Sequence, residues 1–144
     1  MTYGWAILIV IIVVAVLFSL GVFDPSTFTQ TTVTGLSGFN VPVGGWQLTA
    51  AGVLTVQMSN AGGSNINITQ AGASVGSTSA NNNLASGFAG QTLSPGEQIT
   101  LTFTNLGTRT SGASYTARVN VTFDNTNTGI ANFTSSGTLT GSVS

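Results

Sequence analysis

The chain has 144 residues and a formal net charge of −1, with two basic and three acidic side chains and no histidine or cysteine. So few cations argue against nucleic-acid binding, which requires several basic groups to displace counterions. Without histidine or cysteine, catalysis of the Ser–His or Cys–His type and a disulfide framework are excluded, and we expect neither an enzyme nor a protein that carries a cofactor or a metal ion.

Residues 1–23 contain no charged side chain and are apolar on every side of a helix. The sequence predicts a long apolar helix over 2–23, about 33–35 Å in length and close to the thickness of bilayer hydrocarbon. Such a segment must be covered by lipid or by copies of itself, since each large apolar side chain gains roughly 1.5–3 kcal/mol on burial. The segment 1–23 is therefore a candidate polymerisation or transmembrane helix.

Three roles are open for this helix: a secretory signal peptide, a permanent membrane anchor, or a segment that waits in the membrane and then packs among identical helices. A signal peptide would have a basic start, and an anchor would have flanking Lys or Arg. A helix that is apolar all round suits the centre of a crowded bundle. The residues expected to contact neighbouring helices are Tyr3, Trp5, Ile9, Val13, Val16, Leu20 and Phe23.

Residues 24–28 are expected to form a hinge, because Pro25 lacks the N–H that would continue a helix and pushes Asp24 towards extended conformations. The remaining residues, 29–144, are patterned as strands. Apolar and polar side chains alternate at 54–58, 66–68, 99–103 and 115–123, and turn signals lie at 60–63, 94–97 and 124–129. The predicted fold class is α+β, with a long N-terminal apolar α-helix followed by an all-β sandwich-like domain.

One part of this domain has a less regular pattern. Residues 71–92 show no periodicity, and we expect a long polar loop with a weak strand near 84–88.

Five aromatic side chains fall on strand faces or at strand starts and are expected to lie in the core rather than to bind sugars. They are Trp46, Phe103, Tyr115, Phe123 and Phe133.

Three Asn-X-Thr sequons begin at Asn67, Asn120 and Asn132 and are candidate N-glycosylation sites. Apolar residues flank each Asn, so in a strand each Asn points away from the core, towards the solvent, where there is room for a glycan.

Two carboxylates, Glu97 and Asp124, are expected to lie in solvated turns rather than to act as a catalytic pair. The segment 124–129 resembles a calcium loop only weakly, and a hairpin turn is the favoured interpretation.

The opening MTYGWAILIVIIVVAVLFSLGVFDPSTF resembles the start of archaeal type IV-like pilins that carry class III signal peptides. The matching parts are the Thr-Tyr-Gly-Trp-Ala opening, the Leu-Gly-Val-Phe exit and the Pro after it. The resemblance implies a basic leader removed by a prepilin peptidase, helices in the core of a filament, and a β-sandwich-like sheath that is often glycosylated. The opening is less similar to that of archaellins.

Together, these expectations predict a structural pilin subunit that polymerises through its N-terminal helix into an extracellular archaeal type IV-like adhesion pilus. The expected partners are identical subunits, the cytoplasmic membrane before assembly, the prepilin peptidase, the pilus assembly machinery and glycans, but no nucleic acid. Two alternatives are open: an archaellin-like filament subunit, and a membrane-anchored extracellular adhesin or carbohydrate-binding domain that acts alone.

Overall fold

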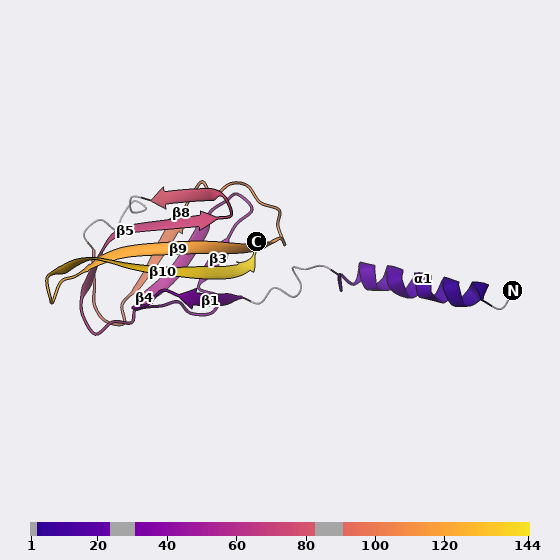
Figure 1. Ribbon diagram of the computed structural model, residues 1–144, viewed down its shortest axis with the longest axis horizontal. Helices are drawn as coiled ribbons and strands as arrows, with labels where there is room; N and C mark the ends of the chain where they lie inside the picture. Colours follow the sequence, from indigo (N-terminus) through magenta and orange to yellow (C-terminus); the bar gives the residue numbers. More distant parts are fainter. Residues whose placement is uncertain (1–2, 24–30, 83–90) are drawn as a thin grey trace.

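The computed structural model describes residues 3–23, 31–82 and 91–144 of the chain (Figure 1). About half of these residues lie in β-strands. The elements in chain order are α1 (Gly4–Ser19), β1 (Thr32–Gly35), β2 (Phe39–Asn40), β3 (Trp46–Leu48), β4 (Leu54–Asn60), β5 (Ile66–Val75), β6 (Thr78–Asn82), β7 (Thr92–Leu93), β8 (Gln98–Phe103), β9 (Ser114–Asn125) and β10 (Ile130–Ser142).

The predicted α+β fold with a long apolar helix is wrong. The described residues are mostly β, and their single helix, α1, has 16 residues and therefore a length of about 24 Å at 1.5 Å per residue. No helix in the described ranges has the combination of length and apolar character that a membrane crossing requires. The predicted hinge residues, Asp24 and Pro25, lie outside the described residues.

The helix ends early because Gly21 adopts a left-handed conformation, with φ of 68°. The N–H of Gly21 donates to the carbonyl oxygen of Phe18 at 3.1 Å. The N–H of Val22 donates to the carbonyl oxygen of Leu17 at 3.2 Å. These two bonds form a Schellman motif, which satisfies the last carbonyl groups and turns the chain away from the helix axis.

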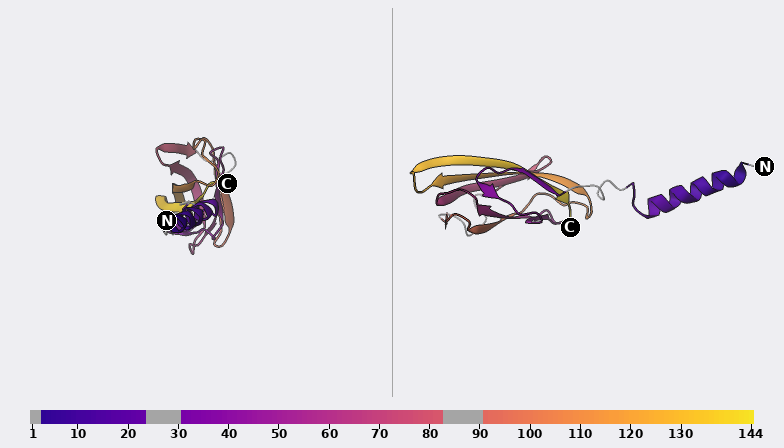
Figure 2. Two further views of the ribbon diagram at one scale, coloured as in Figure 1. Left: turned by 90° about the vertical axis from the view of Figure 1, so that its right-hand side faces the viewer. Right: turned by 90° about the horizontal axis from the view of Figure 1, so that it is seen from below.

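The strands form two antiparallel sheets, which Figure 2 shows as two layers. The larger sheet has the order β1-β10-β9-β5-β6, with β7 also paired to β5, and the smaller has the order β2-β4-β3, with β8 also paired to β4. Inward-facing side chains of both sheets form one buried cluster, to which β4 contributes Leu54, Val56 and Met58. Alternation with period two supplies this core, because every second residue of a strand points to the same face.

The strands predicted at 54–58, 66–68, 99–103 and 115–123 are confirmed, since they lie within β4, β5, β8 and β9. The polar loop predicted over 71–92 is wrong for its first half, because β5 continues to Val75 and β6 follows it. The buried positions of this stretch are Ala71, Ala73 and Val75, and their small side chains give a weak hydrophobic signal. The weak strand predicted near 84–88 lies outside the described residues.

Among the five aromatic side chains predicted to be in the core, Trp46, Phe103 and Tyr115 are buried. Phe123 is half-buried, and Phe133 is exposed, so the prediction is wrong for Phe133. The two rings stack on each other near the end of the β9–β10 hairpin, with centroids 5.7 Å apart. That end of the hairpin lies away from α1 in Figure 1.

Candidate assembly helix and outer sheet face

All seven side chains predicted to mediate helix contacts are exposed in the single chain. Their exposed fractions run from 44% for Ile9 to 81% for Tyr3. Tyr3 precedes the first turn of α1, Leu20 caps its last turn, and Phe23 lies in the turn beyond Gly21. No residue of α1 is buried, so the helix gains nothing from packing against the described β-strands.

The predicted contact residues form one continuous stripe of α1. Trp5, Ile9, Val13, Val16 and Leu20 are separated by four, four, three and four residues, a spacing that places them on one helix face. The rest of the helix surface is equally apolar. Exposed large apolar side chains outside the stripe are Ile7, Leu8, Val10, Ile11, Ile12, Val14 and Phe18. A helix of this kind needs neighbours on several sides, not one partner surface.

The β domain, in contrast, completes its own core. Its buried cluster contains no residue of α1, and several members, such as Leu48, Leu54 and Leu139, have no exposed surface. The domain therefore does not require the helix for burial of its apolar side chains. The exposed large apolar side chains of this part of the described chain are Val43, Ile130 and Phe133.

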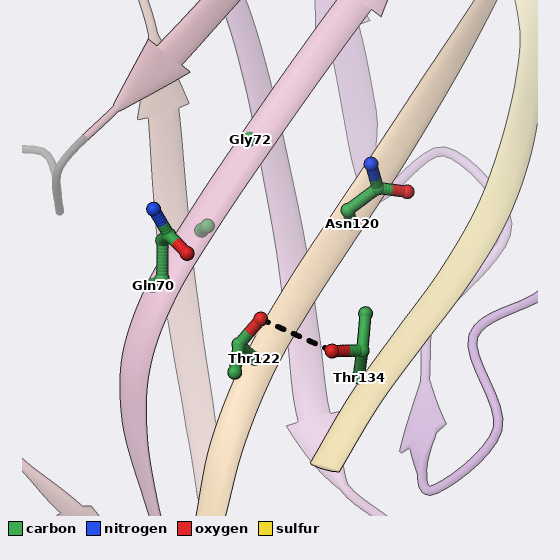
Figure 3. A pocket seen from close by; sticks show the side chains of 6 residues that line it. Gln70, Gly72, Asn120, Thr122 and Thr134 are labelled. Carbon is green, nitrogen blue, oxygen red and sulfur yellow. Dashed lines mark hydrogen bonds between the residues drawn. The ribbon is translucent and has the colours of Figure 1, made fainter. Parts of the chain in front are cut away.

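The outward-facing side of the larger sheet is polar and almost uncharged, and we call it the outer face. It consists of side chains from β1, β5, β9 and β10, among which Arg118 carries the charge. Shallow hollows on it are lined by Thr34, Gln70, Gly72, Ser74, Thr116, Arg118, Asn120, Thr122, Thr134, Ser136 and Thr138. The hydroxyl groups of Thr122 and Thr134 lie 3.4 Å apart across the strand pair, and Figure 3 marks the contact between them with a dashed line. This face offers hydrogen bonds but no cluster of titratable groups.

The two carboxylates considered as a catalytic pair bind backbone N–H groups at separate places: Glu97 lies in a turn as predicted, whereas Asp124 is half-buried in strand β9 and not in a turn. Glu97 accepts a 2.9 Å hydrogen bond from the N–H of Ser94, within the 94–97 turn. Asp124 accepts a 2.8 Å hydrogen bond from the N–H of Asn132, across the β9–β10 hairpin. Among the described residues there is no group of three His, Cys, Asp or Glu side chains that could hold a metal ion.

The turn that contains Glu97 lies at the predicted position, 94–97, and has type II geometry. Gly96 has φ of 83°, as the third position of a type II turn requires, and the N–H of Glu97 donates to the carbonyl oxygen of Ser94 at 3.0 Å. The segment 124–129 also forms a hairpin turn, as predicted, between β9 and β10. The side-chain oxygen of Asn125 stabilises it by accepting bonds from the N–H groups of Asn127 and Thr128.

The three sequon asparagines lie in different surroundings. Asn120 is exposed on the outer face, in the middle of β9, and Asn132 is exposed in β10. Asn67 is half-buried in β5, and its side-chain oxygen Oδ1 is buried without a hydrogen-bond partner. The expectation that all three point freely outward therefore does not hold for Asn67.

Sequence reasoning missed the interaction between Asp124 and Asn132. Asn132 has φ of 63°, and the register between β9 and β10 shifts between Ile130 and Phe133. This β-bulge leaves one N–H without a partner in the ladder, and the Asp124 carboxylate accepts its hydrogen bond. An Asp at the end of a strand before an Asn-rich turn was the available signal, because both residue types tolerate or stabilise left-handed backbone.

No protein-family model matches this chain, and no curated protein matches it. The surface of the molecule is accordingly the best guide to its role. It joins an apolar helix, in which no residue is buried, to a β domain with a closed core and a nearly uncharged outer face.

Proposed function

We propose that the chain is a structural subunit of an extracellular archaeal type IV-like adhesion pilus, and that copies assemble through α1 and the turn after it. The observation that carries the proposal is the contrast between α1, which has no buried residue, and the β domain, which has a complete core. An apolar surface that extends round a whole helix requires several identical neighbours, and a head-to-tail arrangement of such neighbours gives a filament.

The exposed apolar side chains of α1 provide the driving force for assembly. Each large apolar side chain gains roughly 1.5–3 kcal/mol on full burial, and every large apolar side chain from Ile7 to Leu20 except Leu17 is at least 42% exposed in the single chain. Burial among copies therefore provides a large driving force in water. Small residues such as Gly4, Ala15 and Ser19 permit close approach between helices, as in other tightly packed apolar bundles.

The β domain is proposed to form the outer layer of the filament. Its outer face is rich in Thr, Ser, Asn and Gln and has few charges, so subunit contacts and solubility would depend little on ionic strength. The resemblance of the first 28 residues to archaeal pilins supports removal of a leader by a prepilin peptidase and assembly by pilus machinery. Attachment of cells or surfaces is the role that we propose for the filament.

Electron microscopy of the purified full chain without detergent tests this proposal, with Val13→Asp as the disruptive variant. An unpaired carboxylate among packed apolar helices costs several kcal/mol, so we expect the native chain to form filaments and Val13→Asp to remain dispersed. Val43→Asp is the matched control, because Val43 is 85% exposed in a turn of the β domain and should assemble normally.

Circular dichroism of both variants establishes that the β domain remains folded. Dispersed monomers of the native chain, or normal filaments of Val13→Asp, would contradict the proposal. Single copies on a membrane would favour the adhesin alternative. Cells that lack the chain should lose attachment and keep swimming; loss of swimming would favour an archaellin-like filament.

A further inference from the structure

We propose that Asn132 is the N-glycan acceptor of the folded chain, and that Asn67 and Asn120 are inaccessible to the transferring enzyme once the sheet has formed. The proposal requires exposure to a glycosylating enzyme but not assembly into a filament, so it can succeed or fail separately from the function proposed above. It rests on three observed differences: side-chain burial, backbone pairing on each side, and local conformation.

The reaction sets the structural requirement. The side-chain nitrogen Nδ2 of the Asn attacks C1 of the first sugar of a lipid-phosphate-linked oligosaccharide. The C1–Nδ2 bond forms, the bond between C1 and the phosphate oxygen breaks, the lipid phosphate leaves, and one amide proton passes to a base. An enzyme must therefore reach the Asn side chain and also hold the backbone of the sequon as far as the Thr two residues later.

Asn67 fails this requirement on both counts. Its strand, β5, is paired on both sides at this position, where Asn67 lies opposite Thr92 of β7 and Asp124 of β9. The oxygen of its own side-chain amide is buried and lacks a partner. Attachment of a sugar there would require β5 to leave the sheet.

Asn120 satisfies only half of the requirement. Its side chain is exposed on the outer face, but its backbone lies between Gly72 of β5 and Ser136 of β10 (Figure 3). The Thr of its sequon, Thr122, lies 3.4 Å from Thr134 between hydroxyl oxygens, but Thr134 belongs to the Asn132 sequon, so it is the backbone pairing and not this contact that distinguishes the two sites. An enzyme can grip this sequon only before β9 pairs with its neighbours.

Asn132 satisfies both parts. It is exposed, it lies in the β-bulge, and its N–H is bonded to the side chain of Asp124 in β9 rather than to a backbone carbonyl of that strand. Within the described residues β1 pairs with β10 only from Gly137 to Thr140, so the edge of β10 near Asn132 is open on the side away from β9. An enzyme can bind the 132–134 sequon along this edge as an added strand, without opening the sheet.

A glycan at Asn132 would also cover two unusual features of this end of the domain. The neighbouring side chains Ile130 and Phe133 are 55% and 42% exposed, and the open strand edge beside them is a template for unwanted pairing between copies. Natural proteins commonly block such edges with charge, but the charged side chain here, Asp124, is used in the bulge.

The test is in vitro transfer to the full chain produced in a host without N-glycosylation. The folded chain in mild detergent and the urea-unfolded chain, diluted to a tolerated urea concentration, are each mixed with an oligosaccharyltransferase that accepts Asn-X-Thr and with a lipid-phosphate-linked chitobiose. Glycopeptide mass spectrometry then gives the transfer rate at each sequon. We expect the folded chain to be modified at Asn132 at least tenfold faster than at Asn67 or Asn120, and the unfolded chain to be modified at all three.

Matched variants identify the acceptor. Asn132→Gln and Thr134→Ala should abolish transfer to the folded chain, whereas Thr134→Ser, which preserves the sequon, and Asn67→Gln should leave it intact. A bare Asn132 in the folded chain, or transfer to Asn67 or Asn120 at a rate similar to that at Asn132, would overturn the proposal.

Discussion

The helix α1 and strand β4 are built from the same kinds of apolar side chain, yet their burial is opposite. Leu54 in β4 has no exposed surface, whereas Leu8 in α1 is 58% exposed. In β4 polar residues alternate with apolar ones, so a single chain can bury one face of the strand and expose the other to water. In α1 no face is polar, so no arrangement of a single chain can cover it. The comparison indicates that the β domain buries its own apolar side chains and that the apolar surface of the helix is left for lipid or other helices to cover.

The largest expected effect is on the free energy of unfolding, when the same substitution, Leu to Ala, is made in each of the two regions. Leu54→Ala should lower the free energy of unfolding of the β domain by about 2–5 kcal/mol, because it leaves a cavity in a closed core. Leu8→Ala should change it by less than about 0.5 kcal/mol, because Leu8 is exposed and the buried cluster of the described β domain contains no residue of α1. Urea unfolding of the full chain in mild detergent measures both, with Trp46 fluorescence as the signal in a Trp5→Phe background.

The buried position of Trp46 makes its fluorescence a specific reporter of the β domain. If Leu8→Ala destabilised the domain as strongly as Leu54→Ala, the separation of the two regions would be wrong.

A second, smaller effect concerns where the helix ends. Gly21→Ala places a Cβ at a φ of 68°, which costs roughly 1–2 kcal/mol, so we expect the Schellman motif to open and the helix to extend past Leu20. Gly4→Ala, at the other end, has open space around its Cβ and should only strengthen the first turn. The ¹³C chemical shifts of residues 20–23 in the detergent-solubilised chain report the change. Unchanged shifts in Gly21→Ala would show that Gly21 does not set the boundary.

The smallest expected effect is a dependence of the free energy of unfolding on pH in the alkaline range. Burial raises the pKa of Tyr115 above its ordinary value of 10.0, although a backbone hydrogen bond with Leu48 lowers it in part. The unfolded chain therefore loses this proton at a lower pH than the folded chain. The free energy of unfolding should be insensitive to Tyr115 below pH 10 and should fall as the pH rises through the raised pKa.

Tyr115→Phe should remove that alkaline decrease, at a cost of about 0.5–1.5 kcal/mol at neutral pH for the lost hydrogen bond. Thermal unfolding across a pH series measures both effects. An alkaline decrease of the same size in Tyr115→Phe would assign it to another group.

Sequence patterns predicted the parts of the fold in which large apolar residues alternate with polar ones. Strands β4, β8 and β9 carry mostly large apolar residues at every second position, and each was found. The later half of β5 was missed because its inward positions include Ala71 and Ala73, which are too small to stand out from the Gly and Ser between them. Inward-facing and outward-facing residues still alternate there, but they differ little in hydrophobicity.

The helix boundary was missed for a different reason. Sequence reasoning treated Pro25 as the stop signal, whereas the Gly four residues earlier ends the helix by adopting a conformation that other residues rarely take. For the sequons, the local alternation placed each Asn on the outside of its strand. It could not reveal that β5 is paired on both sides at Asn67 or that β10 has an open edge at Asn132, since both depend on residues distant in the sequence.

The central claim is that copies of the chain bury α1, and the exposure of Trp5 tests it most directly. Trp5 is 71% exposed in the single chain. Acrylamide quenching of a Trp46→Phe variant, compared between dispersed chain and sedimented assemblies, measures Trp5 alone. We predict at least a severalfold decrease in quenching and a blue-shifted emission in the assemblies. Equal quenching of Trp5 in both states would show that the helix remains outside the contacts between subunits and would contradict the account.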